Sequence, residues 1–142
     1  MPSPFRHIAA CVDDSPEAAA ALTTARQLAG EDTRVSVVHC VEPPSFLVSL
    51  AAGLGGGVIP DATPLVEAAE AWVRTIAQDD EDAHVLQGAP AREVGRWAAE
   101  HGCDLLVMAS SRSAAERSVL GSFSQRLALE APCSTLIVHA GR

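Results

Sequence analysis

Two loops of the 142-residue chain carry the polar residues that could do chemistry. In the first, the run Asp13-Asp14-Ser15 directly follows an apolar stretch at 5–12. A carboxylate at the end of a strand can accept a hydrogen bond from an adenine amino group or a ribose hydroxyl. The same residues also suit an ordinary turn in which Ser15 caps the following helix. Both interpretations of this loop stay open at the level of sequence.

The second loop covers 109–122 and ends where a helix is predicted to begin. Free N–H groups and the dipole at a helix N-terminus attract phosphate. Ser122 would add a hydroxyl, and Arg112 and Arg117 would add positive charge. The alternative is that Gly121 only permits a turn and that Ser122 only caps the helix.

The sequence lacks the motifs of a catalytic centre. It contains no G-x-S-x-G nucleophile elbow and no H-x-G-H, and its five histidines are scattered. No lysine is present, which removes Schiff-base chemistry. The glycine run at 53–57 is not followed by the Gly-Lys-Ser/Thr of a phosphate loop. We therefore expect a non-catalytic protein, with weak hydrolysis of ATP left open, and an irregular mobile loop over 45–62.

Charge and apolar patterning exclude further classes of protein. The formal net charge is -8 and all ten basic residues are arginines, so no basic face is visible for binding nucleic acid. No apolar run approaches the ~18 residues that a membrane helix needs. The N-terminus also lacks the apolar region of a signal peptide. We expect a cytoplasmic protein without a nucleic-acid or membrane partner.

The four cysteines sit in or beside apolar runs and form no C-x-x-C pair. They are Cys11, Cys40, Cys103 and Cys133. This pattern predicts buried thiols that act as small hydrophobes, and it predicts no metal site. A thiol redox role through Cys11 and Cys40 remains an alternative, although no basic residue is placed to lower the pKa of either thiol.

Hydrophobic patterning predicts one domain over 1–142, with a core at about 5–140. The expected strands are 5–12, 34–41, 83–87, 104–108 and 134–139, and the expected helices are about 15–29, 64–78, 90–101 and 122–130. Ser15 is predicted to cap the first helix and Gly30 to end it. Strict alternation predicts an α/β, Rossmann-like fold: an open five-stranded parallel sheet in the order 3-2-1-4-5, with helices on both faces. Ligands in such sheets bind beyond the carboxyl ends of the strands, where the strand order reverses.

The motifs together resemble the universal stress protein family over roughly residues 5–140. The similarity rests on an ordered set of segments: Val12-Asp13-Asp14-Ser15, Val38-His39-Cys40-Val41-Glu42-Pro43, Gly88-Ala89-Pro90, Asp104-Leu105-Leu106-Val107-Met108, Leu120-Gly121-Ser122 and Ala131-Pro132-Cys133. No single one of these motifs is decisive. The resemblance implies a stress-response accessory protein, or alternatively a signalling module that binds ATP or AMP.

The resemblance also implies where a nucleotide would bind. The family's nucleotide-binding members carry G-x-x-G, nine residues and then G-S or G-T; here Ala109 and Ser111 replace the two glycines, and the segment between them is one residue short. Asp13 matches the acid that contacts adenine, and Cys40 occupies the second-strand adenine position. The candidate nucleotide-binding residues are Asp13, Cys40, Ala109, Ser110, Ser111, Arg112, Gly121, Ser122 and Phe123. We expect weak binding of ATP or AMP, or none.

The last strand predicts a homodimer. Residues 134–139 contain no charge, no lysine and no internal proline, so an edge strand here would lack the usual protection against pairing with another chain. The family's dimers, by resemblance, use this strand. The candidate interface residues are Thr135, Leu136, Ile137, Val138 and His139. Further protein partners are expected, and the sequence does not identify them.

Overall fold

The computed structural model describes residues 2–42, 53, 61–110 and 122–139 of the chain. Within them the elements follow in the order β1 (His7–Cys11), α1 (Ala18–Leu28), β2 (Arg34–Val41), α3 (Thr63–Ile76), β3 (Asp82–Gln87), α4 (Pro90–Glu100), β4 (Leu105–Ser110), α5 (Ser122–Glu130) and β5 (Ser134–His139). The strands form one parallel sheet in the order β3-β2-β1-β4-β5. The predicted α/β fold class and strand order are therefore confirmed.

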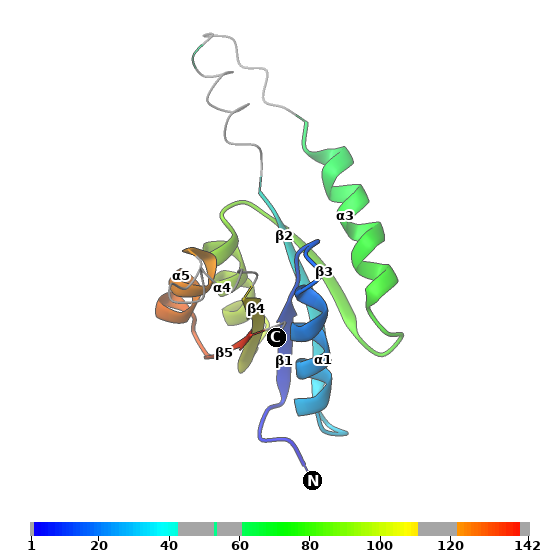
Figure 1. The fold of residues 1–142 in the computed structure, drawn as a ribbon, viewed down its shortest axis with the longest axis vertical. Helices are drawn as coiled ribbons and strands as arrows, with labels where there is room; N and C mark the ends of the chain where they lie inside the picture. Colours follow the sequence, from blue (N-terminus) through cyan, green and yellow to red (C-terminus); the bar gives the residue numbers. More distant parts are fainter. Residues whose placement is uncertain (1, 43–52, 54–60, 111–121, 140–142) are drawn as a thin grey trace.

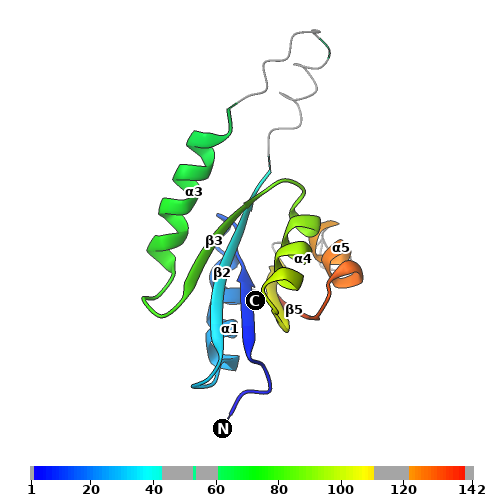
Figure 2. The same cartoon turned by 180° about the vertical axis from the view of Figure 1, so that it is seen from behind.

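The helices form two layers, one on each face of the sheet. Helices α1 and α3 lie on one side, and α4 and α5 lie on the other (Figures 1 and 2). Parallel strands joined by helical crossovers place helices on both faces in this way. The central strands are consequently buried on both sides, and all five residues of β1 are buried or half-buried.

Two apolar clusters hold these layers together. On the first face, Ala21, Leu22 and Ala25 of α1 and Val73 of α3 pack against strand residues such as Val107. On the second face lies the other cluster, formed chiefly by α4, α5 and the strands, whose buried members are Ala9, Val38, Ala91, Val94, Trp97, Ala98, Cys103, Leu106, Met108 and Leu127. Successive residues of each central strand point to opposite faces, so one strand contributes to both clusters.

The two ends of α1 differ from the sequence prediction. Ser15 does not cap the helix, because its hydroxyl donates to Asp13 Oδ1 and α1 begins only at Ala18. Gly30 does not adopt the left-handed conformation of a helix stop. Instead, a Cβ at Gly30 would lie 2.8 Å from the backbone nitrogen of Ser3, so the N-terminal segment crosses too closely for a side chain. Glycine is required there by this close approach.

The buried face of α3 is also narrower than predicted. The predicted stripe of the second helix includes Leu65, which is 50% exposed, and Ala68, which is exposed as well. The buried residues of α3 are Ala69 and Val73. Helix α3 meets the sheet with its C-terminal half and extends past the sheet with its N-terminal half (Figures 1 and 2). Apolar residues near its start consequently have less of the sheet to pack against.

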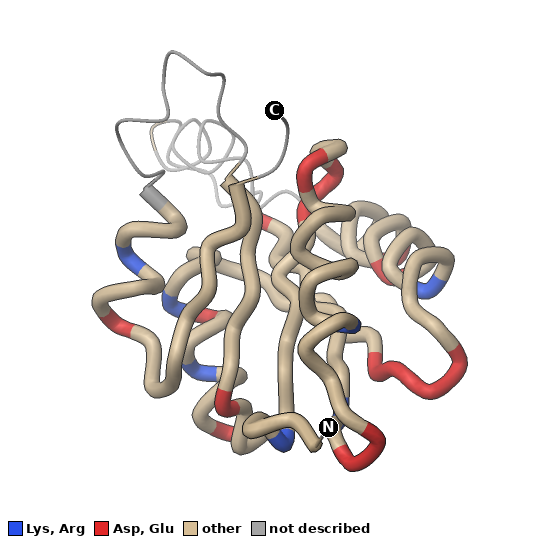
Figure 3. The backbone as a smooth tube through the Cα atoms, turned by 60° about the horizontal axis from the view of Figure 1, so that its bottom comes forward, with Lys and Arg blue, Asp and Glu red and all other residues tan. Residues whose placement is uncertain are grey.

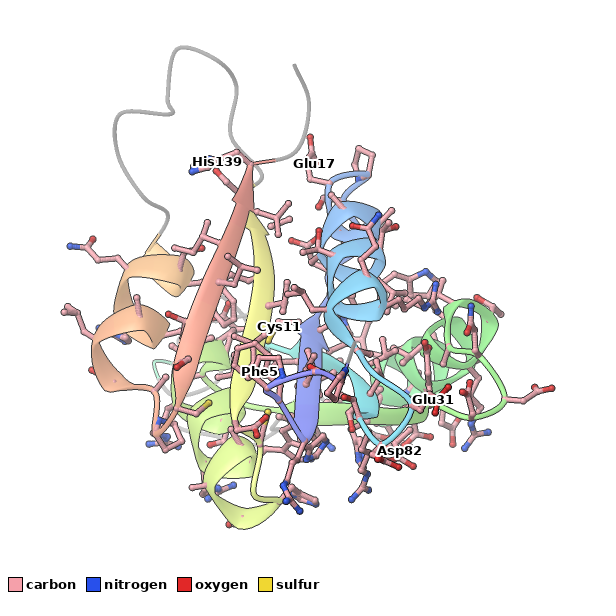
Figure 4. The ribbon with its side chains drawn as sticks, turned by 90° about the horizontal axis from the view of Figure 1, so that it is seen from below. Phe5, Cys11, Glu17, Glu31, Asp82 and His139 are labelled. Carbon is pink, nitrogen blue, oxygen red and sulfur yellow. The ribbon has the colours of Figure 1, made fainter. Side chains whose placement is uncertain are left out.

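Strand β5 lies at one edge of the described sheet, as the sequence predicts, and pairs with β4 from Ser134 to His139. Figure 4 shows this strand running to His139 along the edge of the sheet. Its four central side chains, Thr135 to Val138, are half-buried, while Ser134 and His139 are exposed. Acidic residues are spread over loops and helices of the described chain (Figure 3). In the described part of the chain, no helix is both long and apolar enough to cross a membrane.

Candidate functional site

A cavity of about 370 Å³ opens beyond the carboxyl ends of β1, β2 and β4. Strand β1 pairs with β2 on one side and with β4 on the other, so this is the point at which the strand order reverses. Five of the nine predicted nucleotide-binding residues line the cavity: Asp13, Cys40, Ala109, Ser110 and Phe123. Its volume lies within the range of small-molecule sites.

The carboxylate of Asp13 stands at the mouth of the cavity and is held by its own loop. Its Oδ1 accepts hydrogen bonds from the backbone N–H of Ser15, at 2.9 Å, and from the Ser15 hydroxyl. This local arrangement is an Asx-turn. Asp13 is exposed, and its Oδ2 accepts no hydrogen bond from the described residues. One carboxylate oxygen therefore remains able to accept a hydrogen bond from a ligand.

Strand β2 supplies three consecutive residues to the cavity wall, Val38, His39 and Cys40. His39 Nδ1 lies 2.7 Å from the carbonyl oxygen of Val12, and because a carbonyl can only accept, Nδ1 carries the proton. The His39 ring also packs edge-on against Trp72 of α3, with centroids 5.1 Å apart. Cys40 points toward the opposite face, where its thiol lies 3.6 Å from the carbonyl oxygen of Gly88. His39 thus fixes the end of β1 against β2.

The remaining wall is mainly apolar. It is built by Pro90 and Val94 of α4, Met108 of β4 and Phe123 and Ser124 of α5. Val94 and Met108 are nearly fully buried, so this side of the cavity is part of the second apolar cluster. An apolar wall with a few polar groups at its rim suits a flat heterocycle such as a purine base.

The phosphate side of the predicted site is only partly described. Ser111, Arg112 and Gly121 lie outside the described residues, as does the side chain of Ser122, which begins α5. Ala109 and Ser110 belong to β4 and pair with Val138 and His139. Ala109 is not in a left-handed conformation, since no non-glycine residue of the described chain has a positive φ, so this replacement of a glycine causes no such backbone strain. The glycine run at 54–57 also lies outside the described residues.

All four thiols are less acidic than a free cysteine. Burial raises the pKa of Cys40 to about 11 and that of Cys103 to about 12, and it also raises the pKa of Cys11 and Cys133. Cys11 and Cys40 do line the same cavity. A raised pKa leaves little thiolate at neutral pH, and thiolate is the reactive form. Among the described residues, no group of three His, Cys, Asp or Glu is placed to hold a metal ion.

The sequence prediction missed several residues of the cavity wall. The most informative of these is His39, which it interpreted as a scattered structural histidine. Its position next to Cys40 on a strand that ends at the cavity was the signal that could have identified it. The apolar residues Val94 and Met108 carry no such signal, since their patterns are those of any buried helix or strand.

Comparisons with known proteins agree on one family. The sequence model of the universal stress protein family matches residues 4–139. A universal stress protein of Thermus aquaticus is 35% identical over 143 residues, covering 95% of this chain and 99% of the relative.

Solved structures show the same fold. The universal stress protein UspA from Lactobacillus plantarum is 20% identical, with a TM-score of 0.63 over 94% of this chain and 97% of its own. A universal stress protein in complex with cAMP is 22% identical, with a TM-score of 0.63 over 98% of this chain and 100% of its own. The chain belongs to the universal stress protein family.

Proposed function

We propose that this protein is a non-catalytic stress-response accessory protein that acts as a homodimer and binds an adenine nucleotide weakly. The observation that carries the nucleotide part is the composition of the cavity wall. Asp13, Cys40 and an apolar surface are present on the side predicted for the base, whereas the lining contains no arginine among the described residues. A base can be held by such a wall, but the described part of the lining offers no cation to neutralise a polyphosphate.

The charges near the cavity also favour binding of the base over binding of a polyphosphate. Asp13 and Asp14 lie on the loop after β1, and Glu42 follows β2, all three exposed. The formal net charge of the chain is -8. Each additional phosphate charge on a ligand is therefore repelled, so ATP is expected to gain little over AMP. The related structure in complex with cAMP supports a nucleotide as the class of ligand.

Nucleotide binding is tested first by native mass spectrometry of the freshly purified chain. We expect a dimer that carries little nucleotide, and partial occupancy after addition of AMP. Asp13→Asn keeps the shape of the side chain but removes its charge, and it should change nucleotide affinity while leaving the fold intact. Equal occupancy in the wild type and Asp13→Asn would contradict the assignment of Asp13 to the base.

The homodimer is proposed through the free edge of β5. This edge strand has half-buried apolar side chains in its centre and pairs with β4 alone among the described strands. An uncharged parallel edge strand can pair with a second copy across a two-fold axis. Burial of the exposed parts of Leu136, Ile137 and Val138 would stabilise the pair.

Light scattering separates the two oligomeric states. Ile137→Lys should give monomers, because the charge would be buried between two copies. Ala83→Lys is the matched control, since Ala83 is exposed on β3 at the other edge of the sheet. A wild type that is already monomeric at micromolar concentration, or a monomeric Ala83→Lys, would contradict the assignment of β5.

An ATP- or AMP-responsive signalling module is the alternative function. It requires tight binding, and it is favoured if the undescribed part of the 109–122 loop supplies phosphate contacts. A thiol redox role is less well supported, because burial raises the pKa of Cys40 to about 11 and raises that of Cys11 as well.

A further inference from the structure

Three histidines surround the buried tryptophan of α4. The ring of Trp97 lies 5.7 Å from that of His7, 5.1 Å from that of His84 and 4.7 Å from that of His101, measured between centroids. These histidines come from β1, β3 and the C-terminal cap of α4. Trp97 is only 4% exposed, so the cluster joins the helix to the sheet.

The hydrogen bonds of His7 suit a neutral ring. Its Nδ1 lies 3.1 Å from the carbonyl oxygen of His101, which can only accept, so Nδ1 carries a proton. Its Nε2 lies 2.8 Å from the hydroxyl of Ser36, which can donate to it. Both nitrogens are then satisfied without a charge, and the residue is only 4% exposed. A second proton would place a cation in an apolar layer.

His84 and Trp97 each carry a buried nitrogen that forms no hydrogen bond within the described residues. The two atoms are His84 Nε2 and Trp97 Nε1. A buried polar atom without a partner costs free energy, and a buried charge without a partner costs more. Among the described residues, a protonated His84 would therefore find no acceptor for a proton on Nε2.

The charged neighbours of the cluster do not offset its burial. Burial is the largest cause that lowers the pKa of both His7 and His84, and Arg34 of β2 acts in the same direction on both. His101 and His7 also lower the pKa of His84, whereas the hydrogen bond to the His101 carbonyl raises that of His7. Asp82 of β3 raises the pKa of both rings, and Asp104, before β4, raises that of His7. The Asp82 carboxylate, however, is already paired with Arg34. A cation–π contact with Trp97 would act in the opposite direction, toward a protonated ring.

Helix α4 connects this cluster to the cavity. Val94 lies one turn before Trp97, and both belong to the same buried cluster. Val94 and Pro90, at the start of the helix, form part of the cavity wall. A movement of α4 at Trp97 would therefore change the shape of the cavity.

We propose that His7 and His84, packed around Trp97, make the attachment of α4 to the sheet sensitive to acid, so that α4 loosens below neutral pH and the cavity loses affinity for its ligand. The second half of this statement rests on the proposed function, whereas the first half does not. Protonation of the buried rings is the chemical event, and α4 is the element that responds.

The direction of the effect follows from proton linkage. His7 and His84 have a lower pKa in the fold than their ordinary value of 6.5. The loosened state then binds more protons than the packed state below that value, so the packed state is fully favoured above pH 6.5 and loses stability as the pH falls through it. Each histidine raises the opening constant by up to about tenfold per pH unit in this window.

Hydrogen exchange of the unliganded wild type tests the first half. After correction for intrinsic exchange rates, the α4 amides should lose at least about tenfold of their protection between pH 7.5 and 5.5. The α1 amides, on the other face of the sheet, should lose less than about twofold. Equal losses in α1 and α4, or no loss in α4, would overturn the proposal.

His84→Phe keeps an aromatic ring against Trp97 and removes the titrating group. On a logarithmic scale, it should reduce the pH-dependent loss of α4 protection by about half or more, since one of the two buried rings no longer titrates. Glu67→Gln, at an exposed position of α3 on the other face of the sheet, is the control and should respond to pH as the wild type does. If His84→Phe does not fold, His84→Gln replaces it. A response unchanged in the folded variant would overturn the proposal.

Binding of AMP at pH 7.5 and 5.5 tests the second half. The apparent affinity of the wild type should fall at the lower pH in proportion to the fraction of molecules in which α4 stays packed, and the fall should be smaller in His84→Phe. Unchanged affinity despite α4 opening would overturn the link to the cavity. An absence of AMP binding at both pH values would count against the proposed function instead, and α4 exchange would still decide the acid response.

Discussion

Asp104 and Asp13 stand at opposite ends of the central strands and use their carboxylates differently. Asp104 lies before β4, where it accepts hydrogen bonds from the backbone N–H groups of Arg6, at 2.9 Å, and His7, at 3.0 Å. Those partners lie 98 and 97 residues away in sequence. Asp13 lies after β1 and, among the described residues, accepts hydrogen bonds only from Ser15, two residues away. The Asp104 carboxylate joins distant segments of the chain, whereas the Asp13 carboxylate is bonded within its own loop.

The same contrast extends to the two ends of the sheet. Near the amino ends of the strands, the ion pairs Arg34–Asp82 and Arg26–Glu81 and the packing around Trp97 join separate elements. At the carboxyl ends the chain leaves a cavity with polar groups at its mouth. In parallel α/β sheets ligands bind at the carboxyl ends. Substitutions at the amino ends should therefore alter stability, and substitutions at the carboxyl ends should alter binding.

The largest expected effect is on stability, at Trp97. Trp97→Ala would remove a nearly fully buried aromatic ring between α4 and the sheet. Such truncations cost about 3–5 kcal/mol of the free energy of unfolding. Urea denaturation measures the loss, and Trp97→Phe, which keeps most of the apolar volume, should lose clearly less. A loss below about 1 kcal/mol for Trp97→Ala would show that the cluster does not hold α4.

The two carboxylates provide the next comparison. Asp104→Ala would leave the N–H groups of Arg6 and His7 without their acceptor, at a cost of about 2–3 kcal/mol. Asp13→Ala removes only a local turn contact at an exposed position and should cost about 0.5 kcal/mol or less. Thermal unfolding of both variants, measured side by side, gives the difference. Equal losses would mean that the two ends of the sheet are not specialised.

A pair of glycines gives the third comparison, and the two changes should have opposite signs. Gly88 has a φ of 129°, and a Cβ there would lie 3.0 Å from Cγ of Glu93, so Gly88→Ala should cost about 1–2 kcal/mol. Gly95 lies within α4 and has open space around it, so Gly95→Ala should stabilise the protein by about 0.5–1 kcal/mol. Chemical denaturation of both variants checks the signs. A stabilising Gly88→Ala would show that its turn tolerates another conformation.

Strand positions were predictable because the residues that form them carry a strong local pattern. The β-branched runs predicted β2 and β5 with the bounds that the structure has, Arg34–Val41 and Ser134–His139. Alternation of strands and helices predicted a parallel sheet with helices on both faces. A ligand site beyond the carboxyl ends of the strands followed from that architecture and drew attention to Asp13, whereas Cys40 was assigned by the resemblance to the family; both line the cavity.

Features made by contacts between distant segments were not predictable in the same way. The sequence does not show that Ser3 crosses Gly30, so the role of that glycine was misassigned. The hydroxyl of Ser15 could serve the helix or Asp13, and local geometry decided for Asp13. The cluster around Trp97 draws its histidines from three separate segments, and no spacing rule connects them.

Isothermal titration calorimetry of the wild type with AMP and with ATP tests the central claim most directly. If the cavity holds the base but contributes little to phosphate binding, both nucleotides should bind more weakly than low micromolar, with affinities within about fivefold of each other, or about 1 kcal/mol. Low-micromolar binding of ATP, or a much larger preference for ATP over AMP, would contradict the account and show a working phosphate site.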